Sequence, residues 1–222
     1  MQQNKPNIRL FRDFKHLAKL YYSGARFVAF DTETTGLHPD QDNLLEIGAV
    51  MFDYNGMIGS PFDELIKPPF GIPSFISELT HITDEMVQDK GDEGSVVPSF
   101  LNYLNDRETV LVAHNAPFDV GFVNASLQRL NRPYLPNLVV DTLPLSRWAY
   151  PKLALEAEKG QYKLQSLAKR FEINVFQAHR ADDDARVCME LFKKIISDTL
   201  NQQKDYVIPE KTESKAQQLE LF

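Results

Sequence analysis

The chain has 222 residues, of which 43% are hydrophobic and 25% charged, and its net charge is −7. This composition suits one domain with a sizeable core, and the acidic balance alone argues against nucleic-acid binding, although that argument weakens if the carboxylates bind cations. The sequence contains no apolar run typical of a signal peptide or a membrane span, and the single cysteine excludes an intrachain disulfide and fits a reducing compartment.

The first half of the chain reads as one helix, three strands and three short helices. The helix is predicted over residues 13–23 by apolar positions at helical spacing, and Gly24 ends it. A strand is expected at 27–30, and an Asn55-Gly56 turn predicts a hairpin between strands at 44–53 and 57–67. Short helices follow at 73–79, 83–88 and 97–104.

The second half alternates strands and helices. The continuous apolar run at 109–114 is typical of a buried central strand, and Pro117 can begin a helix over 118–130. A short strand at 138–140 precedes helices at 164–171 and 185–196. This order predicts an α/β fold with a mixed sheet and helices on its faces.

The domain organisation follows from where the composition changes. We expect a helical extension at 1–25, the main domain at 26–200, a flexible linker at 201–217 and a short C-terminal peptide at 218–222. The polar stretch 201–216 has the alternative interpretation of a short extra helix packed on the domain.

Two acids stand at the end of the first predicted strand. Side chains alternate along a strand, so Asp31 and Glu33 point to the same face. At a separation of about 4 Å and an effective dielectric of about 20, such a pair costs roughly 4 kcal/mol, which protonation or a divalent cation would offset. Hard cations such as Mg²⁺ prefer oxygen ligands. A solvated pair at a strand end is the alternative.

Further acids lie near the starts of two predicted helices. Asp119 falls in a first turn, where it interacts favourably with the helix dipole, and it lies close to the end of the central strand. Helical periodicity assigns Asp184 to the buried side of its helix, whereas Asp182 and Asp183 are expected to cap the helix or face solvent. His114, at the end of the central strand, is expected to be structural.

Five residues occur in the order and local contexts of the DEDDh exonuclease family, which includes the proofreading (epsilon) subunits of bacterial replicative polymerases: Asp31, Glu33, Asp119, His179 and Asp184. The resemblance implies a ribonuclease H-like fold with a mixed five-stranded sheet flanked by helices. It also implies a 3′→5′ exonuclease that uses two divalent cations, Mg²⁺ or Mn²⁺. Asp31 would bridge the cations, Glu33 and Asp184 would complete one site, and Asp119 would support the other. His179 would deprotonate the attacking water.

The same resemblance suggests substrate contacts. Thr34, Thr35 and Leu37 resemble the contacts that the family makes with the terminal nucleotide. Thr80 and His81 resemble a second segment, which supports the terminal base. A histidine in an ordinary loop is the alternative for His81.

The last residues of the chain resemble the peptide with which bacterial proteins bind the sliding clamp. Leu219, Leu221 and Phe222 would fill a hydrophobic groove, and Gln218 would fix the orientation of the peptide. Tethering through the linker would concentrate the enzyme at DNA that carries a clamp. An unremarkable amphipathic tail is the alternative.

The leading hypothesis is a DNA exonuclease for proofreading or repair in the cytoplasm, at the nucleoid-associated replication machinery of a bacterium. Its partners would be DNA with a free 3′ end, the sliding clamp and a DNA polymerase catalytic subunit, with no membrane. An RNA-processing exoribonuclease of the same family is the first alternative, because RNA requires only that the pocket accept a 2′-hydroxyl. A non-catalytic adapter for DNA ends or the clamp is a distant one.

Overall fold

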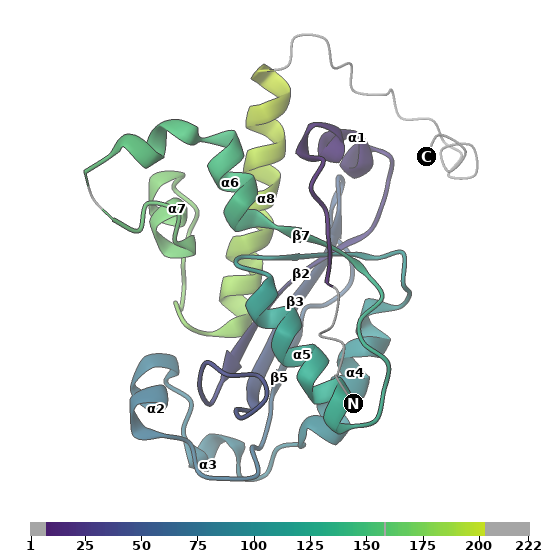
Figure 1. Cartoon of the computed structure of the whole chain (residues 1–222), viewed down its shortest axis with the longest axis vertical. Coiled ribbons are helices and arrows are strands. Elements are labelled where there is room, and N and C mark those ends of the chain that lie inside the picture. The colour runs from purple at the N-terminus through teal and green to yellow at the C-terminus, as the bar shows by residue number, and fades with distance from the viewer. Residues whose placement is uncertain (1–7, 158, 203–222) are drawn as a thin grey trace, which may run out of the picture.

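A mixed β-sheet runs through the centre of the computed structural model, which describes residues 8–157 and 159–202 (Figure 1). The strands lie in the order β1-β7-β6-β2-β3-β4, and β5 also pairs with β3. The strands are β1 (Arg9–Leu10), β2 (Phe27–Thr34), β3 (Leu44–Asp53), β4 (Gly56–Met57), β5 (Phe62–Leu65), β6 (Val110–Ala113) and β7 (Leu138–Asp141).

The expected five-stranded mixed sheet is confirmed and slightly extended. Strands β1, β7, β6 and β2 run parallel, whereas β3 is antiparallel to β2, β4 and β5. Two-residue strands β1 and β4 add to the five longer ones. The predicted third strand at 57–67 is divided into β4 and β5, because Gly59 adopts a left-handed conformation (φ 69°) between them.

Helices cover both faces of the sheet. The helices are α1 (Leu17–Tyr22), α2 (Ser74–Thr80), α3 (Asp84–Val87), α4 (Glu93–Leu104), α5 (Pro117–Arg129), α6 (Thr142–Ala149), α7 (Leu164–Arg170) and α8 (Ala181–Gln202), with 3₁₀ helices η1 (Phe14–His16) and η2 (Pro151–Leu155). One core lies between the sheet and α4 and α5, and the other between the sheet and α1, α6, α7 and α8. Among the helices described, none is both long and apolar enough for a transmembrane segment.

The alternation of β2 decides where its acids point. Phe27 and Ala29 belong to the core under α8, and Val28 and Phe30 to the core under α4 and α5. Continuing this alternation places Asp31 and Glu33 on the α8 face, so the expectation of a shared face agrees with the structure.

Aromatic rings attach the N-terminal helix to the sheet and to α8. The ring of Tyr21 on α1 lies 5.7 Å from Phe27 and 5.6 Å from Phe192, measured between centroids. Phe27 and Phe192 lie 5.1 Å apart, and Phe52 on β3 completes the cluster. Burying four rings with edge and offset contacts favours one fixed position of α8 on β2 and β3.

Helices α4 and α8 extend well beyond their predicted bounds. Helix α8 runs over Ala181–Gln202 rather than 185–196, so it enters the segment 201–217 that was expected to be a linker. Helix α4 begins at Glu93 rather than at 97, because the Asp92 side chain accepts the Ser95 N–H and caps the helix, and Pro98 is tolerated inside it. Helix α6 was not predicted. Its signal was present, since Asp141 caps it by accepting the Leu143 N–H at 3.0 Å.

Gly48 on β3 allows the start of α8 to lie directly on the sheet. A Cβ atom at Gly48 would fall 2.1 Å from the carbonyl carbon of Ala181 and 2.2 Å from the Asp182 nitrogen. Gly48 is also the residue paired with Asp31 across the two strands. The close approach of backbone to backbone therefore brings the first turn of α8 beside the acids of β2.

We expect Gly48→Ala to lower the free energy of unfolding by about 1–3 kcal/mol or more, because the new methyl group meets backbone that cannot turn aside. Gly121→Ala is the matched control. It lies within α5, where a Cβ would meet only Pro39 Cγ at an ordinary 3.6 Å, and it should stabilise the protein by roughly 0.5–1 kcal/mol. Urea unfolding followed by circular dichroism measures both. Equal stability of Gly48→Ala and wild type would contradict the close contact.

Candidate active site

Three of the five predicted site residues meet from segments far apart in the chain. Glu33 lies near the end of β2, His179 lies just before α8, and Asp184 lies in the first turn of α8. Each offers one potential ligand atom, and these atoms all lie within 4.8 Å of one another. The group therefore has the donors and the spacing of a possible metal site.

Asp31 and Asp119 approach the same edge of the sheet from β2 and α5. The Asp119 carboxylate is buried, and its Oδ1 accepts hydrogen bonds from the Thr32 N–H at 3.0 Å and the Thr32 hydroxyl at 2.8 Å. Because Thr32 follows Asp31 directly, these bonds hold α5 beside Asp31. Desolvation, followed by the charges of Asp119, Glu33 and Asp184, raises the pKa of Asp31 well above its ordinary value. The four predicted acids thus share one electrostatic environment.

Burial and mutual repulsion make the ionised forms of these acids unfavourable. Burial, and then the charges of Glu46 and Asp184, raises the pKa of Glu33 to about 8. Burial also raises the pKa of Asp119, which the Thr32 hydrogen bonds oppose, and that of Asp184. A carboxylate in this state binds a proton tightly unless a cation takes its place. Clustered carboxylate oxygens are ligands that hard divalent cations prefer, so the residues present fit such ions.

Neighbouring groups orient Asp184 and His179. The Gln165 amide of α7 donates to Asp184 Oδ1 at 2.6 Å, and the His179 N–H donates to Asp184 Oδ2 at 3.2 Å. His179 has a left-handed backbone (φ 60°), an uncommon conformation for a residue with a side chain, and its side chain is exposed. The hydrogen bond to Asp184 supports this turn and keeps the imidazole close to the acids.

A buried ion pair missing from the sequence-based site lies directly behind it. Glu46 on β3 pairs with Glu33 across the strands and is fully buried. Its Oε1 accepts from Arg180 Nε at 3.0 Å and Nη2 at 2.5 Å, and its Oε2 accepts the Ala181 N–H at 2.8 Å. The signal was an acid inside an apolar strand, which requires a partner. Sequence alone could not say that the partner is the residue after His179.

Asp183 corrects one expectation. It was expected to cap the helix or face solvent, but its side chain is buried and bonds to the preceding loop. Its Oδ2 accepts the N–H groups of Phe176 and Gln177 at 2.6 and 2.8 Å, and its Oδ1 accepts from Arg186 Nε at 2.9 Å. Asp183 therefore folds the loop that leads to His179, which periodicity could not reveal.

The predicted substrate contacts divide into two groups. Thr34, Thr35 and Thr80 use their hydroxyls within the fold: Thr34 donates to the Gly36 carbonyl, Thr35 accepts the Asn43 N–H, and Thr80 donates to the Ile76 carbonyl. Leu37 and His81 have exposed side chains, and His81 ends α2 in a left-handed conformation. The assignment of these residues to substrate stays a prediction. Gln218, Leu219, Leu221 and Phe222 lie outside the described residues.

Comparison with known proteins relates this geometry to a family. A family model described as "Exonuclease" matches residues 28–192. DNA polymerase III subunit epsilon of Treponema pallidum (strain Nichols) is 47% identical over 171 residues, which cover 77% of this chain and 76% of that protein. The PolC-type DNA polymerase III of Caldanaerobacter subterraneus subsp. tengcongensis is 41% identical over 170 residues, or 77% of this chain but only 11% of that much longer protein.

Solved structures agree on the fold. Escherichia coli exonuclease I in complex with a dT13 oligonucleotide superposes with a TM-score of 0.71 at 21% identity, covering 81% of this chain and 42% of that one. A zinc-bound complex of the same exonuclease with single-stranded DNA gives 0.68 at 21% identity, covering 81% and 42%. At this identity the likeness concerns architecture, and it confirms the expected ribonuclease H-like class.

Removing one member of the buried ion pair should be costly. We expect Arg180→Ala to lower the free energy of unfolding by about 3–5 kcal/mol, because Glu46 would be left buried without a counter-charge. The double variant Glu46→Gln/Arg180→Leu should recover much of that loss. Arg170→Ala, which removes an exposed bridge to Glu156, is the control and should cost less than about 1 kcal/mol. Chemical denaturation measures all three, and a loss for Arg180→Ala no larger than the control would contradict the assignment.

Proposed function

The chain belongs to the exonuclease family, and from that membership we propose that it removes nucleotides one at a time from the 3′ ends of DNA, in replication proofreading or repair. The expected likeness to the epsilon exonuclease is confirmed by the family match and by the epsilon relative. The observation that carries the proposal is the meeting of Glu33, His179 and Asp184 within 4.8 Å. They lie at the sheet edge where Asp31 and Asp119 also gather.

We assign four carboxylates to two divalent cations, Mg²⁺ or Mn²⁺: Asp31, Glu33, Asp119 and Asp184. When bound, the cations would supply positive charge to the attacked phosphodiester and to its leaving oxygen. The raised pKa values of these acids support the assignment, since each acid loses a repulsive interaction when a cation binds.

His179 is the group that we assign to proton transfer. Its exposed imidazole, held beside Asp184 by the turn, would take a proton from a water molecule as the water oxygen bonds to phosphorus. The bond between phosphorus and the 3′-oxygen of the preceding nucleotide breaks, and that oxygen takes a proton from solvent. The products are a nucleoside 5′-monophosphate and a strand with a new 3′-hydroxyl.

The relatives favour DNA over RNA. The epsilon relative and the PolC-type relative are named for DNA polymerase III, and one exonuclease I structure holds a dT13 oligonucleotide. Of the predicted contacts, Leu37 and His81 are the two with exposed side chains. We place the protein at the replication machinery in the bacterial cytoplasm, beside a polymerase catalytic subunit. An exoribonuclease with the same chemistry is the outcome that a substrate comparison would identify.

The chemistry is tested with 5′-labelled single-stranded DNA and RNA of one sequence, in Mg²⁺ or Mn²⁺. We expect a ladder that shortens from the 3′ end, faster on DNA, and none without added metal. Asp31→Asn should abolish it, and His179→Ala should slow it by about 10²–10⁴-fold. Asp89→Asn is the control, because it changes an exposed acid that is not one of the five predicted site residues. Equal rates for Asp31→Asn and wild type would refute the assigned site, and a faster RNA ladder would refute the DNA preference.

The C-terminal peptide is proposed to bind the sliding clamp through Gln218, Leu219, Leu221 and Phe222. Deleting residues 218–222, or replacing Leu219 and Phe222 with alanine, should abolish binding to a bacterial sliding clamp in surface plasmon resonance. Hydrolysis of free oligonucleotides should not change, because the described site lies within residues 31–184. Unchanged clamp affinity after the deletion would disprove this role.

A further inference from the structure

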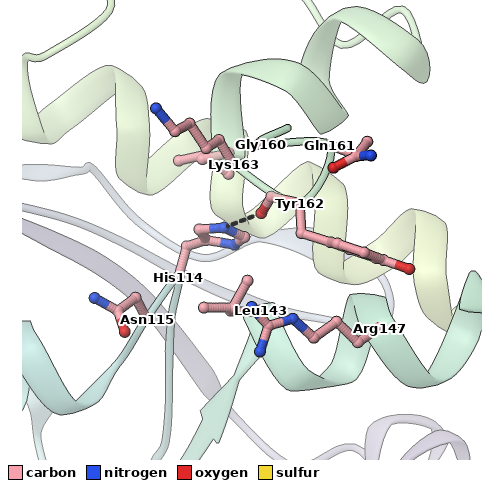
Figure 2. A pocket seen from close by; sticks show the side chains of 9 residues that line it. His114, Asn115, Leu143, Arg147, Gly160, Gln161, Tyr162 and Lys163 are labelled. Carbon is pink, nitrogen blue, oxygen red and sulfur yellow. Dashed lines mark hydrogen bonds between the residues drawn. The ribbon is translucent and has the colours of Figure 1, made fainter. Parts of the chain in front are cut away.

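A pocket of about 510 Å³, whose lining residues are drawn in Figure 2, has no role in the chemistry described above. Its walls come from the residues after β6, from α6, and from the segment that leads into α7. Two cationic side chains line it, Arg147 and Lys163, together with the Asn115 amide. No aspartate or glutamate is among the described residues that line it. The side chains that line this pocket therefore carry positive charge, although the chain as a whole has a net charge of −7.

Neither cation is committed to an acid. Arg147 and Lys163 are both exposed, and no ion pair within 4.0 Å involves either one in the described part of the chain. The Arg147 guanidinium lies 5.8 Å from the centroid of the Tyr162 ring, which restricts it without neutralising it. Asp141 feels the charge of Arg147, but its carboxylate is occupied by the N–H groups of Asn115 and Leu143. Both cations remain available to an anion.

The wall of the pocket is held in place by His114. Its Nε2 lies 2.8 Å from the Tyr162 carbonyl, as the dashed line in Figure 2 shows, and its Nδ1 lies 2.9 Å from the Thr142 hydroxyl. Both ring nitrogens are thus used, which agrees with the expected structural role of this histidine. Burial lowers the pKa of His114 to about 4, so the ring is neutral at pH 7. His114 fixes the loop that carries Lys163, and it is not itself an anion ligand.

Two connections place the pocket next to the catalytic acids. Strands β2 and β6 are parallel neighbours. Asp31 and Asn115 both come after the paired residues of these strands, so they lie at the same edge of the sheet. On the other side, Lys163 is two residues from Gln165, whose amide bonds to Asp184 at 2.6 Å. The pocket and the acidic cluster therefore share one edge of the sheet, where a strand bound at the cluster can also meet the pocket.

We propose that the pocket binds a phosphodiester of the substrate strand on the 5′ side of the bond that is cleaved, an inference that rests on the proposed exonuclease function. The acidic cluster repels phosphates, and bound cations would offset this repulsion only for the phosphodiester that is attacked. The adjoining phosphates therefore need positive charge from the protein. An arginine offers two parallel N–H donors to phosphate oxygens, and a lysine offers a mobile point charge. Such contacts are independent of base sequence and depend on salt.

The test compares a strand with a substrate that lacks that phosphate. For Arg147→Gln, Lys163→Gln and the double variant, kcat/KM is measured on oligo-dT and on the p-nitrophenyl ester of thymidine 5′-monophosphate. We expect the kcat/KM on oligo-dT, divided by the kcat/KM on the ester, to fall about tenfold for each cationic side chain that is removed. The exposed Lys90→Gln is the matched control and should leave the ratio unchanged. The salt dependence of oligonucleotide binding should weaken by about 0.7 in slope for each phosphate that is no longer neutralised.

Two other results would overturn the inference. An unchanged ratio in the double variant would show that the strand does not use the pocket. Weaker inhibition by thymidine 5′-monophosphate with an unchanged ratio would show that the pocket holds the released product instead. Fluorescence anisotropy measures how tightly a labelled oligonucleotide binds to the Asp31→Asn variant, with and without Arg147→Gln and Lys163→Gln. This experiment tests the contact in the absence of hydrolysis. If the wild-type protein hydrolyses neither substrate, the proposed exonuclease function is refuted. The anisotropy measurement would still show whether the pocket binds the strand.

Discussion

Carboxylates that repel one another have to be held a few ångströms apart at one edge of the sheet, and the surrounding elements are attached so as to resist that repulsion. At about 4 Å and an effective dielectric of about 20, each like-charge pair costs roughly 4 kcal/mol before any cation binds. The Thr32 bonds to Asp119 join β2 to α5, and the Arg180 pair with Glu46 joins α8 to β3. Gln165 adds a link from α7. Every element that contributes an acid is tied to a neighbour by a hydrogen bond.

Much of this was readable from local patterns. Strand alternation placed Asp31 and Glu33 on one face, and helical periodicity placed Asp184 on the buried side of its helix, where the structure has both. The apolar run of β6 and the proline that begins α5 gave the position of Asp119 to within a turn. These features depend on residues that are close to one another in the sequence, so local patterns in a single sequence were enough to predict them.

The parts that sequence did not predict depend on contacts between distant residues. Arg180 and Glu46 are separated by 134 positions, and neither residue type indicates the other. Asp183 looked like a solvent-facing acid because its partners, the N–H groups of Phe176 and Gln177, belong to an irregular loop. Helix α6 carried a capping aspartate, but its apolar face is short. The cationic pocket between α6 and α7 exists only once these elements are packed.

Helix α8 carries the chemistry at one end and leads to the rest of the chain at the other. It runs from Ala181, beside the acids, to Gln202, and 22 helical residues span about 33 Å (Figure 1). The Gln202 end of α8 therefore lies far from the turn that carries Asp184, although one helix joins the two. Because α8 packs along β2 and β3, a force applied at Gln202 would reach Asp184 through a single helix rather than through a loop.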